Sequence, residues 1–170
     1  MLDIIEIIKP AEQGKNMPYL CRGENGDLYY VKGIKTTRKG QICEWICANL
    51  AKEFGLPMAP FSLVNIPNNI YSESSSGKVE LGTGTAFATQ NIKFANWYQP
   101  AYADKVSRKL KEDLLAFDWW IQNMDRMKDN PNLLWVNNKL ELTVIDHDSA
   151  FGFEFFPTIF TQEHIFFRCS

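Results

Sequence analysis

The sequence predicts an α+β fold in two parts: an antiparallel sheet with one helix, then a smaller helical part that carries a hairpin. Three observations support this prediction. Short β-branched and apolar segments separated by turn residues fill the first 90 residues, and a single helical pattern interrupts them. The longest helical pattern comes later and is followed by a polar loop and a second hairpin. A length of 170 residues suits one domain or two small lobes.

The first part opens as three strands over residues 2–8, 19–22 and 28–32. Asn25-Gly26 lies between the second and third strands and favours a type I′ hairpin turn. Residues 41–54 show helical spacing, and the apolar residues expected to share one face are Ile42, Trp45, Ile46, Leu50 and Phe54. Further strands are expected at 61–66 and 85–89, on either side of a polar stretch at 67–84 that contains three consecutive serines. We therefore expect a five-stranded antiparallel sheet plus one helix.

The second part begins after an irregular, aromatic stretch at residues 90–103. A helix is expected over 106–124, because its apolar residues recur at helical spacing. A polar loop at 125–132 follows, then a hairpin over 133–148 and a tail rich in phenylalanine. The two parts are expected to divide near residue 95, giving domains 1–95 and 96–170.

Composition excludes several classes of protein. The net charge of -2 lacks the basic excess of a general nucleic-acid binder. No apolar run approaches the roughly 20 residues of a membrane span. The first ten residues carry acidic side chains within their apolar stretch and no basic head, unlike a signal peptide. We therefore expect a cytoplasmic protein with no direct contact to nucleic acid or membrane.

The four cysteines allow two interpretations. Cys43 and Cys47 lie four residues apart on a predicted helix, and the chain has two histidines, His147 and His164, so a zinc site is one interpretation. No CxxC pair occurs, and a chain of this size does not need disulfides. Buried, reduced thiols in a cytosolic protein are the interpretation that we favour.

A set of polar residues offers the groups that phosphoryl transfer requires, in a kinase-like order along the chain. Lys32 ends the third strand, and Glu44 lies early in the following helix, where it can pair with that lysine. Asp125 and Asn130 are five residues apart in the polar loop, and Asp146 ends the second hairpin. Carboxylate and amide oxygens suit Mg²⁺. Each residue alone also has an ordinary structural explanation, such as a solvated strand end or a turn. The order of the set is what points to a nucleotide site.

These residues and their neighbours resemble the HipA-like kinase family, within the wider protein-kinase and phosphoinositide-kinase fold. The resemblance extends over residues 14–153. The motifs that carry it are Pro18-Tyr19-Leu20, Tyr30-Val31-Lys32-Gly33, Glu44 to Ala51 with Gly55-Leu56-Pro57, Asn123-Met124-Asp125-Arg126, Asn130-Pro131-Asn132-Leu133-Leu134 and Val144-Ile145-Asp146-His147.

The resemblance implies a two-lobed kinase fold and a role for each motif residue. Asp125 would be the catalytic carboxylate, Asn130 and Asp146 would hold Mg²⁺, and Lys32, paired with Glu44, would contact the phosphates of ATP. Two loops would complete the nucleotide site. The first, over the phosphates, contains Gly14, Lys15 and Asn16, and the second, a hinge at adenine, contains Gln90, Asn91 and Ile92.

The chain also departs from the family's pattern. There is no GxGxxG in the first hairpin, and Met124 precedes Asp125 where kinases have a His-Arg pair. Asp148 stands where relatives tend to have glycine; it would be a second metal ligand or a turn former, and the turn is favoured. Only 24 residues follow Asp146, so the helical region that completes the lower lobe of such kinases would be absent or reduced.

The leading hypothesis is an ATP- and Mg²⁺-dependent Ser/Thr kinase of HipA-like type. The resemblance further suggests a bacterial toxin–antitoxin context, an unidentified protein substrate, and a partner or antitoxin protein. The alternative is a catalytically degenerate nucleotide-binding or partner-regulating protein, in which the aromatic tail meets another chain or covers the core. A small-molecule phosphotransferase would use the same site with another acceptor.

Overall fold

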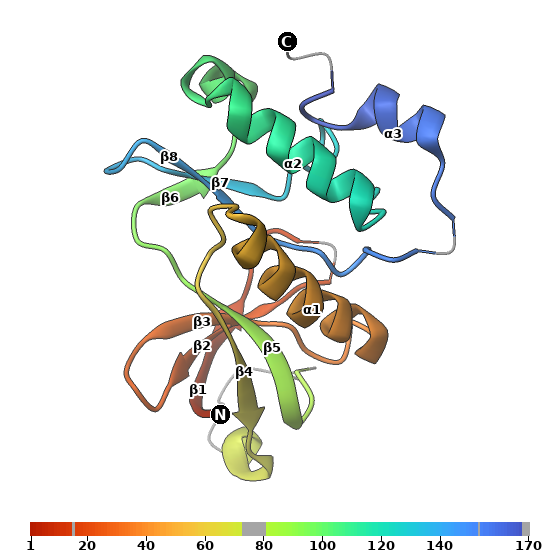
Figure 1. The fold of residues 1–170 in the computed structure, drawn as a ribbon. Coiled ribbons are helices and arrows are strands. Elements are labelled where there is room, and N and C mark those ends of the chain that lie inside the picture. Colours follow the sequence, from red (N-terminus) through yellow and green to blue (C-terminus); the bar gives the residue numbers. More distant parts are fainter. Residues whose placement is uncertain (15, 73–80, 153, 168–170) are drawn as a thin grey trace. The chain divides into compact units, whose positions relative to one another are not determined.

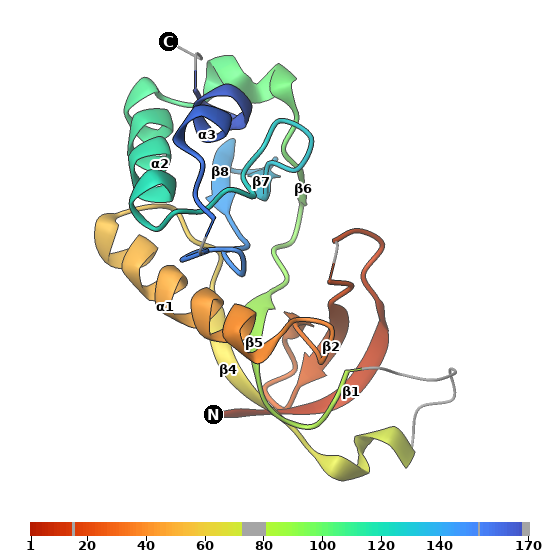
Figure 2. The same cartoon turned by 90° about the vertical axis from the view of Figure 1, so that its right-hand side faces the viewer.

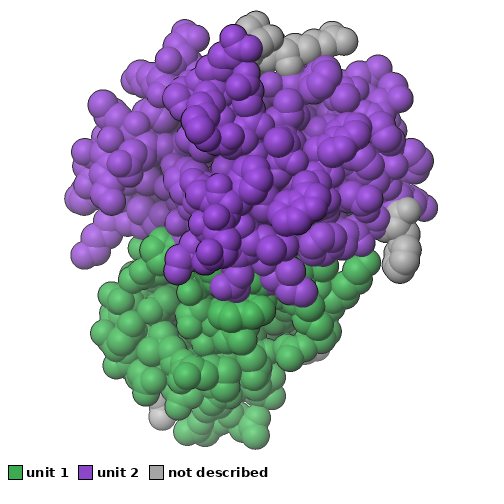
Figure 3. Space-filling model, in the orientation of Figure 1, with its two compact units in different colours: residues 1–45, 60–91 green, residues 46–59, 92–170 purple. Residues whose placement is uncertain are grey.

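The computed structural model describes residues 1–14, 16–72, 81–152 and 154–167. Lys15, the three consecutive serines at 74–76 and one of the four cysteines, Cys169, lie outside the described residues. The chain divides into two compact units, formed by residues 1–45 with 60–91 and by residues 46–59 with 92–170 (Figure 3). The first unit falls within the range expected for an N-lobe. The second half of the first helix and the residues after it group with the later part of the chain.

The first unit contains a small closed β-barrel (Figure 1). Its strands are β1 (Leu2–Pro10), β2 (Tyr19–Gly23), β3 (Leu28–Val31), β4 (Phe61–Ile66) and β5 (Gly84–Gln90), in the spatial order β1-β2-β3-β5-β4. A short 3₁₀ helix, η1 (Asn68–Ser72), follows β4. Four of the pairings are antiparallel, as expected from the sequence. The positions of all five strands agree with the sequence prediction to within two residues at each end.

The expectation of a purely antiparallel sheet is corrected by the pairing that closes the barrel. Leu2 and Asp3 of β1 pair in parallel with Val64 and Asn65 of β4. β1 can reach β4 while still pairing with β2 because its register with β2 shifts twice, between Ile4 and Glu6 and again between Ile7 and Lys9. Such irregularities increase the bend and twist of a strand. The sheet therefore coils until its two edges meet.

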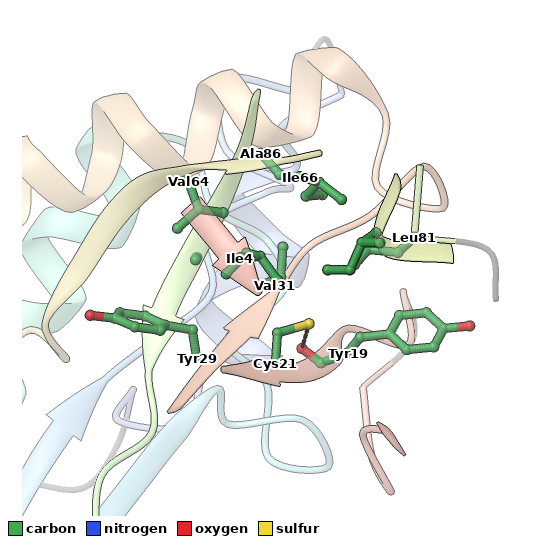
Figure 4. Packing of buried hydrophobic residues seen from close by; sticks show 11 residues of the cluster. Ile4, Tyr19, Cys21, Tyr29, Val31, Val64, Ile66, Leu81 and Ala86 are labelled. Carbon is green, nitrogen blue, oxygen red and sulfur yellow. Dashed lines mark hydrogen bonds between the residues drawn. The ribbon is translucent and has the colours of Figure 1, made fainter. Parts of the chain in front are cut away.

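The barrel interior is a continuous apolar core (Figure 4). Ile4, Cys21, Val31 and Val64 come from four different strands and are fully buried. Alternate residues of β2 and β3 face inward, as the two-residue period of a strand requires. Cys21 is a free thiol whose pKa is raised to about 12 by burial. It packs as a small apolar side chain.

Helix α1 (Arg38–Phe54) contributes residues to both units. The prediction of its apolar face was wrong for four of the five residues: Ile42, Trp45, Ile46 and Phe54 are exposed, and only Leu50 is partly buried. The buried side chains are small and recur at the same helical spacing: Cys43, Cys47, Ala48 and Ala51. Small residues let a helix approach its neighbours closely, so size rather than hydrophobicity alone selects the buried face here. Cys43 and Cys47 are buried and are not joined in a disulfide, as favoured from the sequence.

The second unit consists of a three-stranded sheet and helices (Figure 2). Its elements are β6 (Ala95–Trp97), the 3₁₀ helix η2 (Pro100–Lys105), α2 (Arg108–Trp120), β7 (Leu133–Val136), β8 (Glu141–Val144) and α3 (Pro157–Glu163). The sheet order is β6-β7-β8 and both pairings are antiparallel. The hairpin of β7 and β8 was predicted. β6 and α3 were not predicted, because the surrounding aromatic sequence shows neither helical nor strand periodicity.

The aromatic tail supplies core to the second unit. Phe160 of α3 and the following Ile165 and Phe166 are buried, and Phe160 packs edge-on against Trp119 of α2 with ring centroids 5.3 Å apart. Phe156 remains half-exposed. The tail therefore covers the core through part of its apolar residues. Among the described residues, no helix is long and apolar enough to cross a membrane.

Candidate nucleotide and phosphoryl-transfer site

Lys32 and Glu44 form a buried ion pair in the first unit. Lys32 follows the last residue of β3, Glu44 lies in the second turn of α1, and the Nζ–Oε1 distance is 2.5 Å. Lys32 is 8% exposed and Glu44 is 1% exposed. A buried charge is stable only when it is paired, so each of these side chains holds the other in place. The structure thus brings together the lysine and glutamate that the sequence analysis paired.

Backbone contacts fix the segment that carries Lys32. The Lys32 N–H donates to Phe87 O at 3.0 Å, and the Ile34 N–H donates to Leu81 O at 3.1 Å. Gly33, between them, has no room for a side chain: an added Cβ would lie 2.6 Å from Leu81 O. The glycine is therefore required by close backbone approach rather than by its φ angle.

Gln41 ties the start of α1 to the barrel. Its Nε2 lies 3.3 Å from Gly33 O, and its Oε1 accepts a hydrogen bond from Phe87 N–H at 3.2 Å. Gln41 precedes Glu44 by one helical turn, so these bonds set the position from which Glu44 reaches Lys32. The sequence analysis missed Gln41. A glutamine early in a helix shows its role only once the neighbouring strand is known.

The loop residues predicted to surround the nucleotide lie at two places. Gly14 and Asn16 belong to the connection from β1 to β2, where Gly14 has a φ of 111° and its carbonyl accepts from Met17 N–H at 3.0 Å. Gln90 ends β5 and donates from Nε2 to Asp27 Oδ2 at 3.0 Å. Asn91 ends the first unit and Ile92 begins the second. The predicted hinge is thus the point where the chain passes between units.

Asp125 lies in the second unit, in the loop that links α2 to β7. Its Oδ2 accepts hydrogen bonds from Asn130 Nδ2 at 3.1 Å and from Asn132 Nδ2 at 3.2 Å. The predicted partner Asn130 is therefore next to Asp125, and Asn132 is a second partner that the sequence analysis did not assign. Asn132 has a φ of 48°, which asparagine tolerates better than most residues. The two amides orient the carboxylate.

The pKa of Asp125 is raised, mainly by burial of the carboxyl group. The hydrogen bonds from Asn132 and Asn130 act in the opposite direction, whereas the negative charges of Asp146 and Asp148 add to the rise. A carboxylate that holds a proton more readily than usual is suited to accept one from a hydroxyl group.

Asp146 lies just beyond β8, in a left-handed backbone conformation with a φ of 61°. The Asp148 N–H donates to Asp146 Oδ1 at 3.4 Å, and Asp148 begins a turn. The two residues also offer carboxylate oxygens within 4.8 Å of each other. Asp148 is thus a turn residue, as favoured from the sequence, and it adds negative charge beside Asp146.

These oxygen donors fit a divalent cation such as Mg²⁺. Asn130 directs its Nδ2 at Asp125, which leaves its amide oxygen as the atom that could bind metal. The carboxylates of Asp146 and Asp148 are hard ligands, and their charges already perturb Asp125. A cation would relieve this crowding of negative charge.

Arg126, next to Asp125, is 1% exposed and binds the backbone around the site. Its Nε donates to Asp118 Oδ2 at 2.6 Å. Its terminal nitrogens donate to the carbonyl oxygens of Asn132 at 2.7 Å, Ile145 at 3.2 Å and Asp146 at 3.4 Å. One planar guanidinium therefore holds the loop of Asp125 and the strained backbone of Asp146 together.

Asp118 of α2 is the fully buried centre of this network. It accepts hydrogen bonds from Asn123 Nδ2 at 2.9 Å and His164 Nε2 at 3.0 Å, as well as from Arg126. Burial raises its pKa, but the charge of Arg126 and the hydrogen bond from His164 outweigh this and bring the pKa to about 2. Asp118 is therefore ionised at neutral pH.

Both histidines belong to the same network. His147 Nε2 lies 3.1 Å from Arg126, and because a guanidinium has only donors, this nitrogen is the acceptor. His147 and His164 therefore bind Arg126 and Asp118 instead of forming the zinc site considered above. One signal in the sequence was missed: Asp118 lies four residues after Leu114 and three before Ile121, on the apolar face of its helix.

The predicted site residues are thus distributed over both units. Lys32 and Glu44 belong to the first, and Asp125, Asn130 and Asp146 belong to the second. Within each unit, the residues expected to act together are in contact or interact electrostatically.

A family model described as HipA-like kinase matches residues 4–169, nearly the whole chain. Among solved structures, the chain is similar to the crystal structure of a Helicobacter pylori proinflammatory kinase, CtkA, with a TM-score of 0.61 and 15% sequence identity. The similarity covers 87% of this chain and 59% of that one, so the chain spans about three fifths of that kinase. At this identity the likeness shows the fold. No curated protein matches the sequence significantly.

Proposed function

The chain belongs to the HipA-like kinase family, and from that premise we propose that it transfers the γ-phosphoryl group of ATP to a hydroxyl acceptor. Membership in a kinase family implies the use of a nucleotide and a divalent metal in general. The acceptor that we propose is a serine or threonine of a protein. The observation that carries the proposal is the geometry of Asp125, a carboxylate of raised pKa that is oriented by Asn130 and Asn132.

In the proposed reaction, Asp125 accepts the proton of the acceptor hydroxyl group. The acceptor oxygen then forms a bond to the γ-phosphorus, the bond between that phosphorus and the β–γ bridging oxygen breaks, and ADP leaves with the electron pair. Lys32, held by Glu44, would bind the phosphates of ATP. Asn130 and Asp146 would hold the divalent cation, which supplies neutralisation of the phosphate charge.

Arg126 would act through the backbone. By binding the carbonyl groups of Asn132 and Asp146, it would keep the base and the metal ligand at a constant separation. It touches no reacting atom in this scheme, so it is a positioning residue. Phosphoryl transfer depends mostly on such positioning and on charge stabilisation.

The test is transfer of label from γ-labelled ATP, with Mg²⁺, to the protein itself, to serine- and threonine-containing proteins and to small hydroxyl compounds. The wild type is expected to label an acceptor, and Asp125→Ala is expected to lose about 10²- to 10⁴-fold in rate. Equal labelling by the two proteins would overturn the role of Asp125. Labelling of small hydroxyl compounds alone would overturn the proposed protein acceptor.

A second measurement addresses the degenerate alternative, in which the chain binds nucleotide without transferring phosphate. Lys32→Ala is expected to weaken ATP binding, measured by equilibrium titration, whereas Lys39→Ala, an exposed lysine at the start of α1, serves as the matched control. Tight ATP binding with no transfer to any acceptor would support the alternative and contradict the kinase proposal.

A further inference from the structure

We propose that His164, in the segment that follows α3, is a positioning residue for the loop that carries Asp125. This inference rests on the proposed function, because it assigns a role in the same site. It adds a part of the chain that the catalytic motifs do not include: residues 164–166, the C-terminal segment, which follows α3.

The C-terminal segment contacts the backbone of the catalytic loop directly. His164 and Met127 form an antiparallel β-bridge, and the Ile165 N–H donates to Arg126 O at 3.1 Å. One residue further along the loop, Lys128 Nζ donates to Gln162 O at 3.1 Å. The loop residues just after Asp125 are therefore bound to the tail by main-chain contacts of Arg126 and Met127 and by a side-chain hydrogen bond from Lys128.

The ring of His164 makes two hydrogen bonds that fix its orientation. The Phe166 N–H donates to Nδ1 at 3.2 Å, so Nδ1 is an acceptor. Nε2 then carries the proton and donates to Asp118 Oδ2 at 3.0 Å. Both hydrogen bonds are buried, and His164 as a whole residue is only 2% exposed. The hydrogen-bond partners thus define the tautomer as well as the position of the ring.

Asp118 relays this contact to the site through two neighbours. Asn123 donates to Asp118 Oδ1 and accepts from the Asp125 N–H at 3.3 Å, which links the network to the base itself. Arg126 shares Asp118 Oδ2 with His164 and holds the carbonyl group of Asp146. His164 is therefore the third donor to the Asp118 carboxylate, beside Asn123 and Arg126. That carboxylate orients Asn123, which binds the backbone of Asp125, and Arg126, which binds the backbone of Asp146.

Packing keeps the ring in place. The ring centroid of Phe160, in α3, lies 4.8 Å from that of His164, and Phe160 itself packs against Trp119 of α2. The ring centroid of Phe166 lies 6.4 Å from that of His164, and both Ile165 and Phe166 are buried. These aromatic contacts resist movement of the ring, so the aromatic tail serves to immobilise a polar contact.

Substitutions can separate the two hydrogen bonds of the ring. Glutamine can place an amide donor near the position of Nε2, so His164→Gln keeps the bond to Asp118. Asparagine can accept from Phe166 N–H near the position of Nδ1, so His164→Asn keeps that bond and loses the one to Asp118. We expect His164→Asn to lower kcat about 10- to 100-fold, with KM for ATP within about twofold. We expect His164→Gln to retain most of the activity.

The exposed neighbour Glu163 provides the matched control. Glu163→Gln should leave kcat, KM and the melting temperature unchanged. A purely structural role for His164 would lower the melting temperature of both His164 variants and leave kcat per folded molecule unaltered. That outcome, or equal kcat values for the Asn and Gln variants, would overturn the inference.

Amide hydrogen exchange tests the positioning without any assumption about the reaction. In His164→Asn, amides of residues 125–132 should exchange faster, whereas those of the barrel strands β2 and β3 should be unchanged. Unchanged exchange at 125–132 would contradict the inference even in an active kinase. Faster exchange in a protein that transfers no phosphate would support the inference and contradict the proposed function, so the two failures are distinguishable.

Discussion

Replacing Asp118 with asparagine should destabilise the second unit in a manner that depends on pH. The variant keeps the shape of the side chain and one acceptor oxygen, but it leaves the buried guanidinium of Arg126 without its carboxylate. Removing one partner of a buried ion pair typically costs about 3–5 kcal/mol. We expect a loss of that order in the free energy of unfolding at pH 7.

The pH dependence follows from the pKa of Asp118, which is about 2 in the folded protein. The ordinary value is 3.8, so the folded state binds the proton more weakly than the unfolded state. The resulting stabilisation is fully present above pH 4 and is lost as the pH falls through 2. A shift of this size corresponds to about 2 kcal/mol. The wild type should lose that amount between pH 4 and pH 2, and Asp118→Asn should not.

Urea unfolding at a series of pH values measures the difference. Tryptophan fluorescence reports mainly on the second unit, because Trp97, Trp119, Trp120 and Trp135 belong to it and only Trp45 to the first. Asp113→Asn removes a carboxylate that pairs with the exposed Lys109 on the same helix, and this control should follow the wild type. Parallel loss of stability by wild type and Asp118→Asn from pH 4 to pH 2 would refute the reasoning.

Three other expectations can be checked with similar measurements. The pKa of Asp125 is higher in the folded than in the unfolded protein, so ionising its carboxyl group above its ordinary pKa of 3.8 lowers the free energy of unfolding. Asp125→Asn removes this charge and should therefore raise the melting temperature at pH 7. The gain should vanish at low pH, where the wild-type carboxyl group is protonated. Glu44→Gln should cost about 3–5 kcal/mol in urea unfolding by leaving Lys32 buried without a carboxylate, whereas Glu53→Gln, exposed on the same helix, should not. Gly33→Ala should weaken ATP binding, because its methyl group would displace the backbone next to Lys32; unchanged binding would show that the close contact with Leu81 is not needed.

The strands of the first unit were predictable because their residues alternate and their turns carry recognisable signals. Asn25-Gly26, for example, lies at the β2–β3 turn, where Gly26 has a φ of 83°. The closure of the barrel was not predictable. It depends on register shifts along β1 and on a two-residue parallel pairing with β4, which leave no pattern in the sequence.

The buried face of α1 shows a different limit. Hydrophobic spacing selected a face that runs from Ile42 to Phe54, and four of its five residues are exposed, whereas the helix buries its small residues and the carboxylate of Glu44. Periodicity gives most weight to large apolar side chains. Close packing instead favours the face with small side chains, because that face lets the helix come nearest to the elements beside it. The predicted pairing of Glu44 with Lys32 identified a residue of the buried face, which the apolar periodicity did not.

The residues that support the site were harder to find than those predicted to act in it. Asp125 and Asn130 carry a spacing that can be read directly, and the structure places them in contact. Asp118, Asn123 and His164 are separated by up to 46 residues and meet only through the fold. Their importance follows from a general rule: a buried carboxylate needs hydrogen-bond donors. Once the structure identifies the donors to Asp118, it also shows which parts of the site Asp118 connects.

The measurement that tests the central claim most directly is the single-turnover rate at which γ-phosphoryl leaves ATP, at saturating ATP and Mg²⁺. The wild type is compared with Asp125→Asn and with Asp129→Asn, an exposed aspartate of the same loop. We predict that Asp125→Asn loses about 10²- to 10⁴-fold while still binding ATP, and that Asp129→Asn retains the wild-type rate. Equal rates for wild type and Asp125→Asn would contradict the assignment of Asp125 as the catalytic base.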